Sequence, residues 1–118
     1  MTDYVLPIPA SAALDHLGLS FPDQVVEGDP VESGVTVHDH AASRASVGLW
    51  ESEAGAIDFA SYPFDEFCSV VSGRIELVEE GGGSWGFGPG DAFIIRKGFR
   101  GLWRMPVTTR KYYVEMHG

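Results

Sequence analysis

The sequence lacks several features that would assign a compartment or a partner directly. Its single cysteine, Cys68, excludes an internal disulfide, so nothing in the chain depends on an oxidising environment. No apolar run approaches the ~20 residues of a membrane-spanning helix. The first residues also lack the basic and apolar segments of a secretory signal. We therefore expect a cytoplasmic protein with no membrane partner.

Basic residues are scarce and unevenly distributed. Eight Lys and Arg stand against 17 Asp and Glu, and the net charge of −9 argues against nucleic acid as a partner, because phosphate binding needs clustered basic residues. Six of the eight lie between Arg96 and Lys111. This distribution predicts that the acidic body is neutralised across neighbouring strands, because opposite charges on paired strands attract. A local site for an anionic ligand is the alternative.

Long helical patterns are also missing. Short β-branched and aromatic runs are separated by Gly and Pro, which is typical of consecutive antiparallel strands. We expect a short N-terminal arm whose one helical turn is capped by Ser11 and ended by Gly18, followed by a loop over 21–30. The pattern predicts a single all-β domain of eight to ten strands. The expected strands cover 31–40, 46–50, 57–60, 67–71, 75–78, 92–95, 102–105 and 111–114.

Two groups of residues resemble the cupin motifs. Glu66 and Gly73 match the end of the first motif, and Gly90 with Gly98 matches the frame of the second. The stretches 48–51, 62–67, 98–103 and 110–114 resemble the small single-domain cupins related to ureidoglycine aminohydrolase and to the ethanolamine-utilisation cupin. The resemblance implies an RmlC-like jelly-roll β-barrel (a double-stranded β-helix) over 31–118, with 1–30 as an arm of the same domain. It also implies a homodimer.

The resemblance implies a metal site, but this sequence lacks most of the ligands that such a site needs. Metal-binding cupins carry two His before the Glu and a third after the second motif. Here the third position falls on Gly101, and Glu66 is the one usual ligand present. One carboxylate is not a transition-metal site, so we predict no metal cofactor with these ligands. The positions of the two His that precede the Glu fall on Ala60 and Tyr62, or on Phe59 and Ser61, depending on the spacing.

The only His-x-His pair of the chain lies outside the motif position. His38 and His40 alternate on an expected strand, so both rings could face one ion. An exposed pair without a metal is the simpler interpretation. If a divalent metal is bound, the predicted ligands are His38 and His40 with Glu66 or Asp58.

Glu66 is the candidate catalytic residue. If its side chain points inward, its charge needs a partner, for which Arg96, Arg100 and Lys111 are the candidates. It then acts as a general acid or base, or as a ligand-binding carboxylate. The alternative is a buried ion pair without chemistry.

Other residues are candidates for a ligand pocket. Cys68 shares the face of Glu66 and is expected to be a small buried hydrophobe. We expect Phe67 and Phe93 to pack in the core. Arg96 takes the place of a residue that lies at the barrel mouth in the family, where it could hold a carboxylate or phosphate. The predicted ligand-binding residues are Trp50, Tyr62, Phe64, Cys68, Arg96, Phe99, Trp103 and Tyr113.

Three functions fit these observations. The first is a cupin that binds a small polar metabolite in its barrel. The second is an enzyme of ureide, amine or sugar metabolism that uses Glu66 as acid/base or metal ligand. The third is a non-catalytic accessory subunit whose barrel is filled with side chains.

Overall fold

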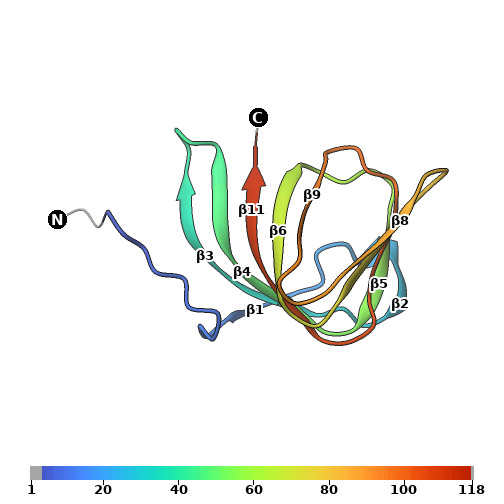
Figure 1. Cartoon of the computed structure of the whole chain (residues 1–118), viewed down its shortest axis with the longest axis horizontal. Helices are drawn as coiled ribbons and strands as arrows, with labels where there is room; N and C mark the ends of the chain where they lie inside the picture. The colour runs from blue at the N-terminus through green and yellow to red at the C-terminus, as the bar shows by residue number, and fades with distance from the viewer. Residues whose placement is uncertain (1–3, 118) are drawn as a thin grey trace.

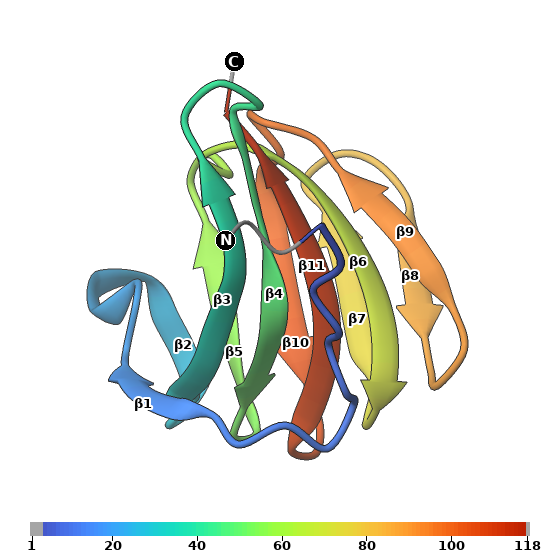
Figure 2. The same cartoon turned by 90° about the vertical axis from the view of Figure 1, so that its left-hand side faces the viewer.

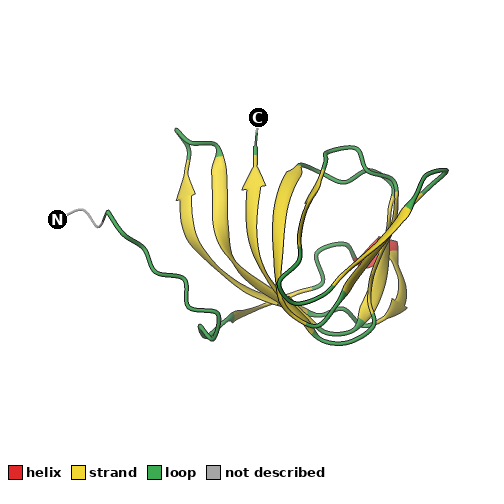
Figure 3. Cartoon of the chain, viewed as in Figure 1, coloured by secondary structure: helices red, strands yellow, loops and turns green. Residues whose placement is uncertain are grey.

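The computed structural model describes residues 4–117 as two antiparallel sheets that face each other (Figures 1 and 3). One sheet has six strands in the order β1-β3-β4-β11-β6-β9, and the other has five in the order β2-β5-β10-β7-β8. The only helical segment in this range is the short 3-10 turn η1 (Pro22–Gln24). The strands are β1 (Asp15–Gly18), β2 (Val25–Gly28), β3 (Glu32–His40), β4 (Ala45–Ser52), β5 (Gly55–Phe59), β6 (Asp65–Ser72), β7 (Ile75–Glu79), β8 (Ser84–Phe87), β9 (Ala92–Ile95), β10 (Gly101–Met105) and β11 (Thr109–Met116).

The chain passes back and forth between the sheets after β4, which is the path of a jelly roll. The strands β5, β7, β8 and β10 belong to one sheet, whereas β6, β9 and β11 belong to the other. The predicted all-β jelly roll is therefore confirmed, although the two sheets remain separate and do not join into one closed barrel. No helix within 4–117 is long and apolar enough to cross a membrane.

Eight predicted strands are present, but the prediction for the N-terminal segment is wrong. The expected helical turn ending at Gly18 is instead strand β1, which pairs with β3. The expected loop over 21–30 contains η1 and strand β2, which pairs with β5. Strand β8 was also missed. The strands β1, β2 and β8 have only four residues each, and each lies at an edge of its sheet. Pairing with a neighbour, and not local alternation, decides such short strands.

The segment before β1 runs along the outer face of β11, as Figure 2 shows. Its backbone is tied there by two side chains of that strand. The Tyr112 hydroxyl donates to the carbonyl oxygen of Ile8 at 2.6 Å, and Arg110 donates to that of Ala10 at 2.7 Å. These bonds hold the arm against the outside of the six-stranded sheet, away from its inner face.

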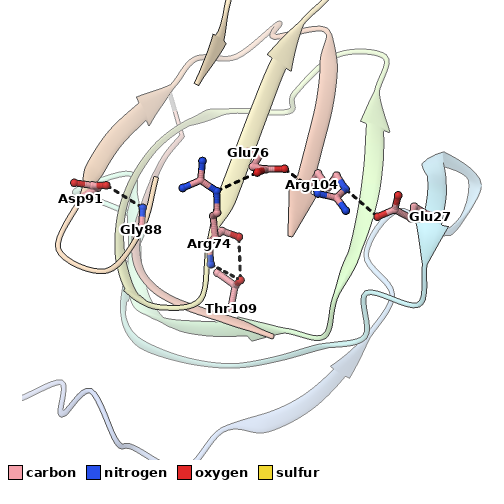
Figure 4. A network of polar contacts seen from close by, with 7 residues as sticks. All are labelled: Glu27, Arg74, Glu76, Gly88, Asp91, Arg104 and Thr109. Carbon is pink, nitrogen blue, oxygen red and sulfur yellow. Dashed lines mark hydrogen bonds and ion pairs between the residues drawn. The ribbon is translucent and has the colours of Figure 1, made fainter. Parts of the chain in front are cut away.

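Opposite charges meet across neighbouring strands, as the sequence predicts. Arg104 on β10 pairs with Glu76, its register partner on the neighbouring β7, at 2.9 Å, and, across the intervening β5, with Glu27 on β2 at 3.0 Å (Figure 4). Arg110 on β11 pairs in the same way with Glu51 on β4 at 3.0 Å. Because these side chains remain partly exposed, between 19% and 53%, solvent screens each pair, which adds at most about 1 kcal/mol of stability.

Strand β6 shows which side chains point between the sheets. Glu66, Cys68 and Val70 are buried, at 3%, 0% and 2% exposure. Phe67 alternates with them and is 37% exposed on the outer face, so the prediction that it packs in the core is wrong. The strand period of two forces this result, because a strand that buries Glu66 and Cys68 must turn Phe67 outward. Phe93 packs against the core as predicted.

Candidate functional site

A cavity of about 530 Å³ lies between the sheets. Its polar lining comes from strands that are distant in the chain, with Glu32 on β3, Glu66 on β6 and Lys111 on β11. The walls are largely aromatic, and the rings of Tyr62 and Trp103 stack at 6.1 Å between centroids with 5° between their planes. The aromatic residues of the lining are Phe21, Trp50, Phe59, Tyr62, Phe64, Trp103 and Tyr113.

Glu66 and Lys111 form a buried ion pair at the centre of this site. The Lys111 Nζ atom donates to Glu66 Oε2 at 2.7 Å, and each side chain is 4% exposed. The other oxygen of Glu66 accepts a hydrogen bond from the Tyr62 hydroxyl. Both oxygens of the carboxylate are therefore engaged by the protein itself, one by an ammonium ion and one by a phenol.

The surroundings of Lys111 favour its charged form. Its Nζ atom lies 4.6 Å from the ring centroids of both Trp50 and Trp103, where the faces of the indoles attract a cation. Burial by itself lowers the pKa of Lys111, but the anionic forms of Cys68 and Glu66 attract the ammonium, and the net pKa lies above its ordinary value. Lys111 is thus a fixed cation at neutral pH, and Glu66 is its counterion.

Tyr62 and Cys68, which are both hydrogen-bonded to this pair, stay neutral at pH 7. Burial, followed by the repulsion of Glu66, raises the pKa of Tyr62 well above its usual range, so Tyr62 acts as a hydrogen-bond donor. Burial raises the pKa of Cys68 to about 12, although Lys111 opposes the shift from 3.5 Å. Cys68 is therefore a thiol at neutral pH, as expected for a buried cysteine, and is not a nucleophile.

A second polar group surrounds Glu32 on β3. Its Oε1 atom accepts hydrogen bonds from Trp50 Nε1 at 2.8 Å and from the Ser20 hydroxyl at 2.9 Å. Its Oε2 atom accepts one from the Ser20 backbone nitrogen at 3.1 Å. Glu32 thereby fixes the Trp50 indole, which in turn covers Lys111.

A third polar group lies near the end of β11. The hydroxyls of Tyr113 and Thr36 are hydrogen-bonded at 2.8 Å. Glu115 stands directly opposite Glu66 in the register of β11 and β6 and also lines the cavity. Burial and then the charge of Glu66 raise the pKa of Glu115. Two carboxylates therefore share this end of the cavity.

The structure brings most of the predicted ligand-binding residues to one place. With Glu66, the cavity lining includes Trp50, Tyr62, Phe64, Trp103 and Tyr113, while Cys68 lies outside the lining and its Sγ atom accepts a hydrogen bond from Lys111 Nζ at 3.5 Å. Arg96 and Phe99 lie apart, in a separate hollow beside Trp85. Arg100 pairs on the surface with Glu80 at 3.6 Å. Of the three proposed partners of Glu66, only Lys111 reaches it.

Glu32, Thr36 and Glu115 were not predicted from the sequence, and Lys111 was predicted only as a possible partner of Glu66. A signal was present in β11, where Lys111, Tyr113 and Glu115 alternate and so share one face. A strand whose inward positions are polar predicts a polar interior. Glu32 had no comparable signal, because its inward orientation depends on how β3 pairs with β4.

The residues around Glu66 do not fit the metal that the cupin resemblance implies. Ala60 and Ser61 are exposed and are not metal ligands. A side chain at Gly101, the third position, would place its Cβ atom 2.1 Å from the carbonyl oxygen of Val78. Glu66 is already neutralised by Lys111. Among the described side chains of residues 4–117, which exclude that of His40, no group of three or more His, Cys, Asp or Glu could hold a metal ion.

The alternative metal set receives no support from the described residues. His38 forms a hydrogen bond with Ser43 through its Nε2 atom at 3.2 Å and is not part of the cavity lining. The side chain of His40, the second predicted ligand, lies outside the described part of the structure.

The jelly roll and the Glu66-centred cavity between its sheets define the class of this protein as a small cupin. A family model, the EutQ-like cupin domain, matches residues 40–113, which is more than half of the chain. The chain therefore belongs to the EutQ-like cupin family. This confirms the resemblance to the ethanolamine-utilisation cupin, whereas nothing supports the ureidoglycine aminohydrolase branch in particular. No curated protein matches the chain.

Solved structures share this fold at low sequence identity. A protein of unknown function of the DUF861 family from Pseudomonas syringae superposes with a TM-score of 0.86 at 21% identity, over 92% of this chain and 46% of its own. The chain thus spans about half of that protein. EutQ from Clostridium difficile has a TM-score of 0.64 at 21% identity, over 75% and 64% of the two chains. The Salmonella typhimurium ethanolamine utilization protein gives 0.64 at 16% identity, over 89% and 94%.

Proposed function

We propose that this EutQ-like cupin is a cytoplasmic, homodimeric protein that binds a small polar metabolite in the cavity between its sheets. The observation that carries the proposal is the cavity of about 530 Å³, in which aromatic walls surround a few converging polar groups. Cavities of roughly 300–1,000 Å³ with this kind of lining are typical of small-molecule sites. The cavity also argues against an accessory subunit whose interior is filled with side chains.

The geometry favours binding over acid/base chemistry at Glu66. A general base must come within hydrogen-bond reach of the proton that it removes, and Glu66 is only 3% exposed. Both oxygens of Glu66 accept hydrogen bonds, from Tyr62 and from Lys111. We therefore assign Glu66 the role of counterion and positioning residue for Lys111, which also donates to Cys68 Sγ at 3.5 Å.

A thermal-shift screen against ureides, amines, keto acids and sugar acids tests the binding function. A ligand at a hundred times its dissociation constant stabilises the folded state by ~2.7 kcal/mol, which raises Tm by about 10 °C for a domain of this size. The variant Thr36→Phe places a ring in the cavity and should abolish the shift. Val107→Phe adds the same ring at an exposed position outside the cavity lining and should retain it.

The proposal fails if no compound shifts the wild type, or if every shift persists in Thr36→Phe. Sedimentation equilibrium tests the homodimer separately. We expect a mass twice that of one chain, and a single-chain mass at all concentrations would refute that part.

A further inference from the structure

The charges that line the cavity are unbalanced. Lys111 is the only basic residue of the described lining, and Glu66 neutralises it at 2.7 Å. Three further carboxylates remain, those of Asp15, Glu32 and Glu115. The potential in the cavity is therefore negative, and low-dielectric walls concentrate such a field.

Glu32 is the most buried of these three carboxylates, with 7% of its surface exposed. Its three hydrogen-bond donors, from Ser20 and Trp50, are all neutral groups. None of the ion pairs within residues 4–117 supplies it with a cation. A buried carboxylate without a countercharge is costly, and a positively charged ligand would offset that cost.

Glu32 is well separated from Glu66 along the sheet, whereas the Trp50 indole contacts both Glu32 and Lys111. It pairs across β4 with Ser52, which pairs in turn with Thr109 at the start of β11. Glu66 pairs with Glu115, six residues further along β11, which corresponds to roughly 20 Å of strand. Lys111 lies nearer, because it is two residues from Thr109 and its Nζ atom is 4.6 Å from the ring centroid of Trp50, which donates to Glu32. Its charge, however, is neutralised there by Glu66 at 2.7 Å.

Aromatic rings complete the Glu32 end of the cavity. Phe21 follows Ser20 directly, and its ring packs edge-on against Phe59 at 4.9 Å. Both rings belong to the lining, as does the Trp50 indole that Glu32 orients. Ring faces attract cations and do not favour anions, so the walls and the carboxylate select for the same charge.

We infer that the ligand of this cavity is a small organic cation, such as a primary ammonium or an amidinium, whose charged group binds Glu32. The inference rests on the proposed function, because it names the ligand class of the same cavity. The cationic group donates to the Glu32 carboxylate, and the apolar body of the ligand lies between the aromatic walls.

Three probes of one shape isolate the effect of charge, namely butylamine, butan-1-ol and butyrate. Binding is read from the fluorescence of Trp50 and Trp103 in a Trp85→Phe background, since Trp85 is the only other tryptophan and lies outside the cavity lining. We expect butylamine to bind at least about tenfold more tightly than either other probe, as a charge-assisted hydrogen bond provides.

Glu32→Gln keeps an acceptor oxygen for Ser20 and Trp50 but removes the charge. It should raise the dissociation constant of butylamine about tenfold and leave that of butan-1-ol unchanged. Glu53→Gln removes an exposed carboxylate outside the cavity lining and should change neither value. Far-UV circular dichroism of both variants shows whether the fold is retained.

The outcomes separate the inference from the proposed function. If butan-1-ol or butyrate binds as tightly as butylamine, the cavity binds small molecules but the cation inference is overturned. The cation inference is overturned equally if a folded Glu32→Gln binds butylamine normally. If neither these probes nor any compound of the thermal-shift screen binds, the proposed function fails as well. The wild-type comparison of the three probes decides the matter even if Glu32→Gln does not fold.

Discussion

Replacing Lys111 by Met tests the buried ion pair most directly. Met fills most of the volume of the Lys side chain but leaves the Glu66 carboxylate without its cation. Only the Tyr62 hydroxyl then remains to hold the charge of Glu66, which is 3% exposed. Removing one partner of a buried pair costs about 3–5 kcal/mol, against a total stability of about 5–15 kcal/mol for a domain.

Urea unfolding followed by tryptophan fluorescence measures this loss. We expect Lys111→Met to lower the free energy of unfolding by about 3–5 kcal/mol. The double variant Lys111→Met with Glu66→Gln should recover at least about 2 kcal/mol of it, because no unpaired charge remains. Arg100→Met is the matched control, since its pair with Glu80 is more than two-thirds exposed, and it should cost less than about 0.5 kcal/mol.

The reasoning about the pair is refuted if Lys111→Met lies within about 1 kcal/mol of the wild type. It is refuted equally if the double variant is no more stable than the single one. The pH dependence gives a further check. Since the pKa of Lys111 is raised above its ordinary value of 10.5, its contribution is fully present below that pH and is lost as the pH rises past its folded value.

Three further outcomes follow from the same site. Glu115→Gln should raise the free energy of unfolding at pH 7, measured in urea, by roughly 0.2–1 kcal/mol. Burial and the charge of Glu66 raise the pKa of Glu115, so its ionised form opposes folding. An unchanged or lower free energy of unfolding would contradict this. Cys68, with a pKa of about 12, should resist iodoacetamide at pH 8 in the native protein and react in urea, as mass spectrometry will show; rapid native labelling would contradict its burial. Gly101→Ala should lower the stability of the fold by more than ~2 kcal/mol in thermal unfolding. The φ angle of Gly101 is +150°, and a Cβ atom there would meet the carbonyl oxygen of Val78. A near-native Tm would contradict this close approach.

The fold was largely predictable from local patterns. Alternating runs such as 75–78 and 102–105, separated by Gly and Pro, specify strands through their own periodicity. The four-residue strands Asp15–Gly18 and Val25–Gly28 carry no such pattern, and their pairing with longer strands decides them. The helical turn expected over 11–18 was wrong for that reason.

The candidate site was predictable only in part. Side chains alternate between the two faces of a strand, so a strand that buries Cys68 must bury Glu66 as well. The aromatic residues Tyr62 and Trp103 were recognisable because a buried polar tip needs a partner. Arg96 was an equally reasonable partner for Glu66 by charge, yet it is exposed beside a different hollow.

The sequence by itself determined the all-β class and most of the strands, because glycine turns and strand alternation act over a few residues. Only the tertiary structure decided that Lys111 neutralises the Glu66 carboxylate, 45 positions away, and that Glu32 lines the same cavity without a cation. Strand register between distant segments sets these contacts. Register is a property of the assembled sheets, so no short stretch of the chain encodes it.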